Sequence, residues 1–201
     1  MSIQEALSNY HNSLYYNQEW HRLAIKGDID SIVNIGTDFA RSEMMDYAVA
    51  CWQHVIDNGH GTADAYSNLG VSYYYGNGVC QDYKKAVQYY QRAAAKGHPF
   101  GMYNLAVACE NGNGTPQDMD KAIKYYQMAA EHGVNMAIDA LTRLGLYSET
   151  LDLAIYPRSV DDYSYYDSLD ELHLDGTSDG ETFYYQLIWL DTILDCLPLY
   201  S

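Results

Sequence analysis

The sequence predicts an all-α fold, a solenoid of about four antiparallel helix pairs with an acidic C-terminal extension. Two observations predict the solenoid. One is an internal repeat, and the other is the spacing of apolar residues along one helical face within each copy. A third observation predicts the extension, because the composition becomes acidic and rich in tyrosine after Leu146.

The repeat has two clear copies, residues 65–100 and 101–136. They align without a gap, so that Leu69 matches Leu105 and Gly78 matches Gly114, an offset of 36 residues. This length is typical of helix-pair repeats. We therefore expect one helix pair per copy, with stacked copies burying the apolar faces that a single pair leaves exposed.

The second helix of each copy has recognisable ends. Alanine and tyrosine residues recur on one helical face between Asp82 and Gly97. Asp82 is placed to accept hydrogen bonds from the first N–H groups of the helix, and Gly97 can adopt the left-handed conformation that ends one. The next copy repeats this order with Asp118 and Gly133.

The Gly-Asn-Gly of residues 76–78 looks at first like a phosphate-binding loop, with Lys84 and Lys85 beyond it. Its second copy lies between two helices of the next repeat, and the acidic Asp82 beside it would repel phosphate. We therefore interpret this loop as the turn of a helical hairpin and predict no phosphate site there.

Weaker copies flank the two clear ones. An aromatic residue stands seven positions before a glycine at Trp20/Gly27 and Trp52/Gly59, as in the clear copies. We expect weaker units over residues 3–27, 28–64 and 137–148. The solenoid should then occupy residues 1–150, followed by a second region over 151–201.

The pattern A-x-x-N-L-G-x-x-Y … G-x-G-V-x-Q-D-x-x-K-A-x-x-Y-Y-x-x-A-A-x-x-G-H of residues 65–98 resembles the Sel-one-like repeat family, relatives of the tetratricopeptide repeats. The resemblance is specific over residues 65–136 and does not cover 151–201. It implies a right-handed α/α superhelix that acts as a protein-binding adaptor without catalytic residues. The second clear copy departs from the pattern at Ala106 and Cys109, which affects local packing.

The acidic stretch of residues 157–181 has three interpretations. It is a solvated linker, a tyrosine modification region, or a recognition strip whose carboxylates face lysine and arginine of a partner. The following residues, from Phe183, fit an amphipathic helix that closes the solenoid, with a β-hairpin around 175–180 as the competitor. The strip residues are Asp161, Asp162, Tyr163, Tyr165, Tyr166, Asp167, Asp170 and Glu171.

Composition narrows the function classes. The formal charge is −16, from 27 acidic residues against 11 Lys and Arg, which opposes binding to nucleic acids and anionic membranes. This acidity either attracts a basic partner or serves only to keep the protein soluble. The N-terminus lacks a secretory signal pattern and no apolar run is long enough to span a membrane. The four cysteines are dispersed, without the pairing of secreted relatives, which indicates reduced thiols. We expect a cytoplasmic protein.

No catalytic constellation stands out. The seven histidines are scattered, and His60 and His98 follow helix-ending glycines, which favours a capping role over metal binding. No metalloprotease, nucleophile-elbow or nucleotide-binding motif occurs. We predict that the chain is not an enzyme and has no metal site and no cofactor.

First helices of such hairpins commonly line the groove of the superhelix. The expected binding surface is therefore on these helices and on the acidic strip. We predict a non-catalytic binding protein, most concretely an immunity-type inhibitor that neutralises a basic partner such as a bacterial toxin. The alternatives are an adaptor that assembles signalling or envelope complexes and a bacterial effector that binds host proteins. The oligomeric state is open. The predicted solenoid residues are Tyr66, Asn68, Tyr74, Tyr75, Met102 and Asn104.

Overall fold

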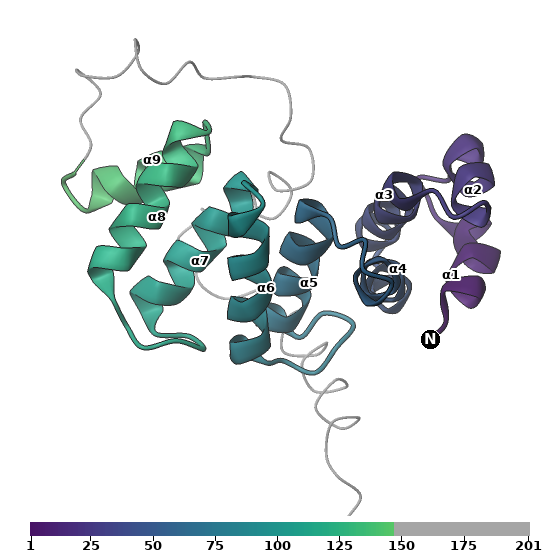
Figure 1. The fold of residues 1–201 in the computed structure, drawn as a ribbon, viewed down its shortest axis with the longest axis horizontal. Coiled ribbons are helices and arrows are strands. Elements are labelled where there is room, and N and C mark those ends of the chain that lie inside the picture. The colour runs from purple at the N-terminus through teal and green to yellow at the C-terminus, as the bar shows by residue number, and fades with distance from the viewer. Residues whose placement is uncertain (147–201) are drawn as a thin grey trace, which may run out of the picture. The chain divides into compact units, whose positions relative to one another are not determined.

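The structure is a computed structural model, and it describes residues 1–146. Throughout these residues the secondary structure is helical, with no strand. Figure 1 shows the helices following one another from α1 at the N-terminal end to α9. Their bounds are α1 Ile3–Asn9, the short 3-10 helix η1 Tyr10–Asn12, α2 Gln18–Ile25, α3 Ile29–Arg41, α4 Met45–Asp57, α5 Ala63–Tyr75, α6 Tyr83–Ala95, α7 Pro99–Asn111, α8 Met119–Glu131 and α9 Asn135–Arg143.

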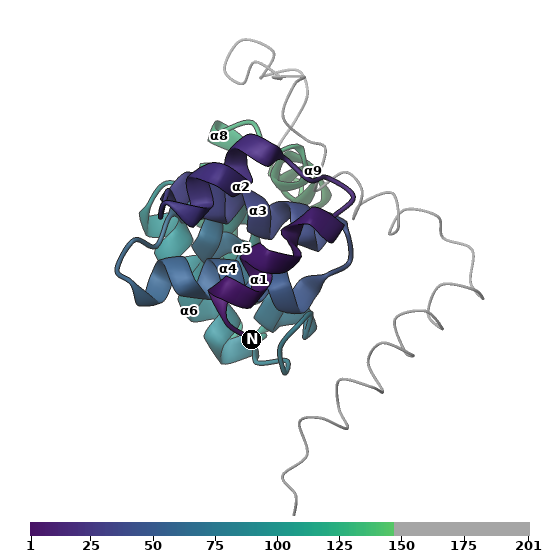
Figure 2. The ribbon, with the colours of Figure 1, turned by 90° about the vertical axis from the view of Figure 1, so that its right-hand side faces the viewer.

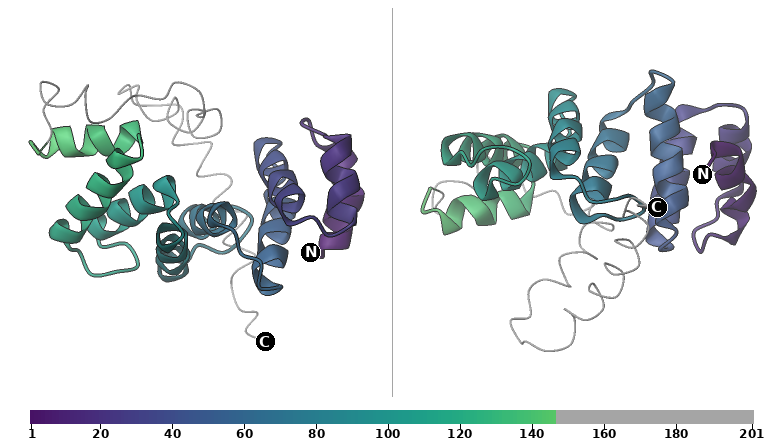
Figure 3. Two further views of the ribbon diagram at one scale, coloured as in Figure 1. Left: turned by 45° about the horizontal axis from the view of Figure 1, so that its top comes forward. Right: turned by 90° about the horizontal axis from the view of Figure 1, so that it is seen from below.

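Neighbouring helices form antiparallel pairs that pack in chain order. From α2 to α9 each helix contacts the next, and α1 also contacts α4. The view from the N-terminal end places α1 and α2 in front of the later helices (Figure 2), and the two further views keep the same order (Figure 3). The prediction of an all-α solenoid of helix pairs is confirmed for the described residues.

The helix ends of the clear repeats follow the sequence pattern. Asp82 and Asp118 each cap the N-terminus of a second helix, accepting from the backbone N–H three residues later at 3.0 Å. Gly76 and Gly112 end the first helices in the left-handed conformation, with φ of +78° and +72°. The Gly-Asn-Gly loop is therefore the turn of a helical hairpin, as predicted.

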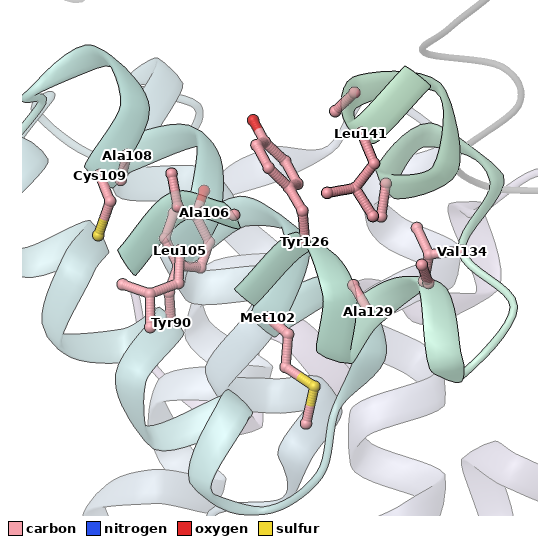
Figure 4. Packing of buried hydrophobic residues seen from close by; sticks show 14 of the residues in the cluster. Tyr90, Met102, Leu105, Ala106, Ala108, Cys109, Tyr126, Ala129, Val134 and Leu141 are labelled. Carbon is pink, nitrogen blue, oxygen red and sulfur yellow. The ribbon is translucent and has the colours of Figure 1, made fainter. Parts of the chain in front are cut away.

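One continuous apolar cluster joins α5 to α9. Its residues include the rings of Tyr90 and Tyr126, each 1% exposed, with alanines on the facing helices. Figure 4 shows the side chain of Tyr126 on α8 near that of Leu141 on α9, and both belong to this cluster. Alanine lets the helices approach closely while each tyrosine ring fills the space between them.

The departures of the second repeat from the family pattern are accommodated in this core. Ala106 is fully buried and Cys109 is 4% exposed. Cys51 and Cys109 are free thiols, and burial raises the pKa of Cys51 to about 12. Cys80 is disulfide-bonded, so the expectation of reduced thiols is wrong at this position.

Candidate partner-binding surface

The first helices expose less of their surface than the sequence suggested. Asn68 is 8% exposed and Met102 is 4% exposed, so neither side chain offers the exposed binding surface that was predicted for it. The reason is that a first helix packs on two sides. α7 contacts α8 of its own pair and also α6 and α5 of the preceding pair. Met102 belongs to the apolar cluster formed there.

Asn104 is half-buried, and its Nδ2 atom is buried without a hydrogen-bond partner among residues 1–146. A bound chain cannot reach a buried nitrogen without moving the side chains that cover it. Asn68 and Asn104, both predicted as binding residues, therefore do not present accessible amide nitrogens to a partner.

Three tyrosines gather where α5 ends and α6 begins. The ring of Tyr74 lies 5.0 Å from that of Tyr75 and 4.9 Å from that of Tyr83, edge to face in both cases. Tyr75 is 56% exposed and Tyr83 is 36% exposed, whereas Tyr74 is half-buried. We call Tyr74, Tyr75 and Tyr83 the tyrosine cluster. Two of its members were predicted, and Tyr83 was not, although its place next to the Asp82 cap exposes it.

A residue of the next repeat holds the tyrosine cluster in position. Asn113, in the loop between α7 and α8, donates from Nδ2 to the Tyr74 hydroxyl at 2.6 Å. Gln81 donates from Nε2 to the Tyr74 carbonyl at 2.8 Å, and Gln117 does the same to the Glu110 carbonyl one repeat later. These bonds satisfy carbonyls that the helix ends leave free, and they hold the exposed rings on ordered backbone.

Tyr66, the remaining predicted residue, belongs to a second aromatic row. Tyr89 lies between Tyr66 and Tyr73, with ring centroids 6.3 Å and 5.5 Å apart. The Lys85 Nζ stands 5.0 Å from the Tyr73 ring and the Arg92 Cζ stands 5.6 Å from the Tyr66 ring. Such distances allow cation–π attraction. The Tyr66 ring therefore interacts with the Arg92 guanidinium as well as with the Tyr89 ring.

A polar cluster joins the last three helices. Glu110 accepts from the Tyr126 hydroxyl at 2.6 Å and from the Arg143 guanidinium at 2.7 Å. Burial by itself raises the pKa of Glu110, but these two hydrogen bonds together with the Arg143 charge lower it below its ordinary value. Sequence reasoning did not find this cluster, because its members are 16 and 33 residues apart in the chain.

The predicted strip residues Asp161, Asp162, Tyr165, Tyr166, Asp167, Asp170 and Glu171 lie outside the described residues. Within residues 1–146 no group of three or more His, Cys, Asp or Glu side chains is arranged to hold a metal ion. None of the described helices is both long and apolar enough to cross a membrane.

His98, which sequence analysis assigned to capping, does cap a helix. Its Nδ1 accepts from the Gly101 N–H at 3.0 Å at the start of α7, and its Nε2 lies 3.0 Å from Asp64. His60, in the matching position after Gly59, is exposed, and Thr62 caps α5 instead.

Comparisons with known proteins agree with this geometry. The Sel1 repeat model matches residues 63–98 and 99–134. A protective antigen of uropathogenic Escherichia coli that displays an SLR fold is 27% identical, with a TM-score of 0.56, over 63% of this chain and 27% of its own. A Sel1 repeat protein from Oxalobacter formigenes is 26% identical, with a TM-score of 0.54, over 62% of this chain and 96% of its own. No curated protein matches the sequence.

The chain thus spans about a quarter of the length of the Escherichia coli antigen and nearly all of the Oxalobacter protein. Sel1 repeat solenoids are in general protein-interaction modules, and families of this kind are typically non-catalytic. The matched residues are the helix pairs α5–α6 and α7–α8, with their caps and Gly-Asn-Gly turns. Residues 63–134 thus consist of two Sel1 repeats, and the chain is similar in fold to solved Sel1-like repeat proteins.

Proposed function

We propose that this protein is a non-catalytic, cytoplasmic inhibitor of the immunity type, which binds and neutralises a basic protein such as a bacterial toxin. The observation that carries the proposal is the uneven distribution of charge. Residues 1–146 contain ten Lys and Arg against 15 Asp and Glu, a formal charge of −5. Residues 147–201 contain one Arg against 12 acidic residues, a formal charge of −11.

The charge distribution supports two regions with different tasks. In this proposal the solenoid of residues 1–150 provides a rigid frame and residues 151–201 carry most of the field that attracts the partner. Complementary charge accelerates encounter between proteins, and the effect weakens as salt screens it. The acidic strip, with Asp161, Asp162, Asp167, Asp170 and Glu171, would then face lysine and arginine on the partner.

The tyrosine cluster supports a second partner contact, which would lie on the solenoid. Exposed tyrosines contribute large contact area with little loss of side-chain freedom, and they are enriched among the residues that dominate binding energy. Tyr75 and Tyr83 are exposed and Tyr74 is held by Asn113. We assign partner contact to Tyr74, Tyr75 and Tyr83, with Tyr66 and Asn104 as half-buried neighbours. Asn68 and Met102 are left out because they are buried.

The test is capture of partners by the full-length chain from its source cell, followed by binding kinetics with the captured protein. A five-residue variant, D161N/D162N/D167N/D170N/E171Q, should lower kon at low salt by at least about tenfold. The matched control, E5Q/D30N/D46N/E131Q/D139N, changes the same charge on exposed solenoid positions and should have a smaller effect. An acidic partner, or equal effects of the two variants, would show that the proposal is wrong.

The adaptor alternative predicts a different result from the same capture. An adaptor should retain several partners, each weakly, and mutation of the tyrosine cluster should weaken the binding of all of them. A toxin-like reading frame immediately beside the gene would favour the inhibitor. A partner found only among host proteins would favour the effector.

A further inference from the structure

One helix of this acidic protein is basic. α6 has three basic residues and no acidic residue, and Lys96 follows at its C-terminus. In every other helix of residues 1–146 the acidic residues equal or outnumber Lys and Arg. Positive charge is thus concentrated on one element of the solenoid. We call Lys84, Lys85, Arg92 and Lys96 the α6 basic stripe.

The stripe lies along one side of the helix. Lys85, Arg92 and Lys96 are seven and four residues apart, spacings that place side chains on one helical face, and Lys84 is adjacent. At a rise of 1.5 Å per residue the stripe is about 16 Å long. All four residues are exposed, so that another molecule can reach them.

The cations of the stripe are not neutralised by ion pairs. None of the four forms one with a carboxylate of residues 1–146. Acids do lie nearby. Burial raises the pKa of Tyr73, and the charges of Asp82 and Asp57 raise it further. Asp64 is engaged by the His98 imidazole at 3.0 Å. The stripe is therefore available to carboxylates of another molecule.

An aromatic row runs beside the cations. It consists of Tyr66 and Tyr73 on α5 and of Tyr89 on α6, all half-buried. The Tyr89 ring lies 6.3 Å from that of Tyr66 and 5.5 Å from that of Tyr73. Lys85 and Arg92 stand over the Tyr73 and Tyr66 rings, and a cation held in this way keeps N–H groups free to bind a carboxylate. The surface thus combines positive charge with aromatic area.

The next repeat lacks most of both features. Counted 36 residues later, the stripe positions hold Asp120, Lys121, Met128 and His132, and the positions of the aromatic row hold Met102, Cys109 and Tyr125. The helices α7 and α8 nevertheless form the same kind of pair as α5 and α6. Stacking of the repeats therefore does not require the stripe or the row.

We propose that the α6 basic stripe and the aromatic row bind an acidic segment of a partner protein, one that also carries aromatic residues. Its carboxylates pair with the four cations, and its rings pack on the tyrosines of the row. An extended segment advances about 3.3 Å per residue, so about five residues cover the length of the stripe.

The acidity of the whole chain does not prevent this contact. The formal charge is −16, but at physiological salt the Debye length is about 8 Å, and exposed charges farther away are largely screened. A nucleic acid is a poorer fit, because its phosphate backbone binds to more extended basic surfaces than four cations on one helix. The site also differs from the acidic region that is proposed to attract a basic partner. Each of the two proposals can fail without the other.

The experiment measures binding of a rhodamine-labelled nonapeptide, (Glu-Glu-Tyr)3, to the full-length protein by fluorescence anisotropy. Binding should saturate at low salt and be lost at about 1 M salt, where the Debye length is about 3 Å. The variant K84Q/K85Q/K96Q should bind about tenfold more weakly, because three favourable charges are removed. The control K26Q/K121Q/K124Q removes the same number of exposed lysines elsewhere and should bind as the wild type does. Circular dichroism should show the same helix content in both variants.

Three results would overturn the proposal: no saturable binding, equal weakening in the two variants, or equal affinity for the uncharged peptide (Gln-Gln-Tyr)3. Carbodiimide cross-linking of the bound peptide, followed by mass spectrometry, locates the site. Links should form with Lys84, Lys85 and Lys96. Links spread evenly over these residues and the three lysines of the control variant would show that the peptide has no preference for α6.

Discussion

Gly114 lies against the backbone of Tyr83, so closely that a Cβ atom at position 114 would stand 2.1 Å from the Tyr83 carbonyl oxygen. The loop between α7 and α8 thus rests on the start of α6. The same relation occurs one repeat earlier, where a Cβ at Gly78 would stand 2.8 Å from the Met45 backbone. The second glycine of each Gly-Asn-Gly turn is therefore required by the stacking of repeats.

We predict that Gly114→Ala destabilises the protein by about 2–5 kcal/mol. The backbone of Tyr83 cannot yield as a side chain can, and φ at Gly114 is +75°, which costs a non-glycine residue about 1–2 kcal/mol by itself. Urea unfolding followed by circular dichroism would measure the loss.

Gly97→Ala is the matched control for this prediction. Gly97 also has a positive φ, +82°, but nothing lies within 4 Å of a Cβ built there. This variant should lose only the conformational cost of about 1–2 kcal/mol. If the two variants were equally stable, the contact with Tyr83 would not matter and the role assigned to the second glycine would be wrong.

The sequence was sufficient to predict the helix pairs of residues 65–136, because the same caps and turn glycines recur 36 residues apart and so indicate the same helix pair in both copies. It was not sufficient to find the exposed side of α7. The first helix of a solenoid pair is covered by its own partner and by the preceding pair, so Met102 is buried. One available signal was the apolar character of α7 around most of its circumference, which is typical of a helix buried on two sides.

Contacts between repeats also lay beyond sequence reasoning. The tyrosine cluster depends on Asn113, 39 residues after Tyr74, and the polar cluster around Glu110 depends on Arg143. These partners differ from repeat to repeat. Position 110 matches Tyr74 in the preceding copy, so the repeat pattern could not indicate an ionic contact there.

Glu110 should make the stability of the protein depend on pH in the acid range. Because its pKa is lowered in the folded state, its contribution is complete above the unfolded value of about 4.3 and is lost as pH falls through the folded pKa. The variant Glu110→Gln should therefore be less stable than the wild type at pH 6 and should approach it below about pH 4. Thermal unfolding from pH 3 to pH 6 measures this difference, and a constant difference across the range would contradict it.

Asp38 should act in the opposite direction. It is 3% exposed on α3, where it accepts from the Tyr10 hydroxyl at 2.5 Å. Burial raises the pKa of Asp38 above its ordinary value, although the Tyr10 hydrogen bond and the Arg41 charge lower it in part. The folded state thus binds the proton more tightly, and stability at this site rises as pH falls from above the folded pKa toward about 3.9.

We accordingly predict that Asp38→Asn is at least as stable as the wild type at pH 7, because an amide oxygen still accepts from Tyr10 without a buried charge. Asp38→Ala removes that acceptor and should cost about 1–3 kcal/mol. Urea unfolding of both variants at pH 7 distinguishes the two effects. A large loss in Asp38→Asn would show that the charge itself stabilises the N-terminal helices.

His98 connects two repeats through one imidazole ring, and its two hydrogen bonds can be separated by mutation. Since Nδ1 accepts from the Gly101 N–H, the ring proton is on Nε2 and donates to Asp64 at 3.0 Å. This hydrogen bond lowers the pKa of Asp64.

His98→Ala should cost about 1 kcal/mol through loss of the α7 cap, whereas His98→Asn should recover most of that loss, because asparagine is a good cap. In both variants the pKa of Asp64 should rise toward its ordinary value, since neither retains the imidazole donor. Unfolding experiments measure the first effect and carboxyl NMR titration measures the second. If the pKa of Asp64 stayed low in both variants, another group would be responsible for it, and the link between α5 and α7 through His98 would not hold.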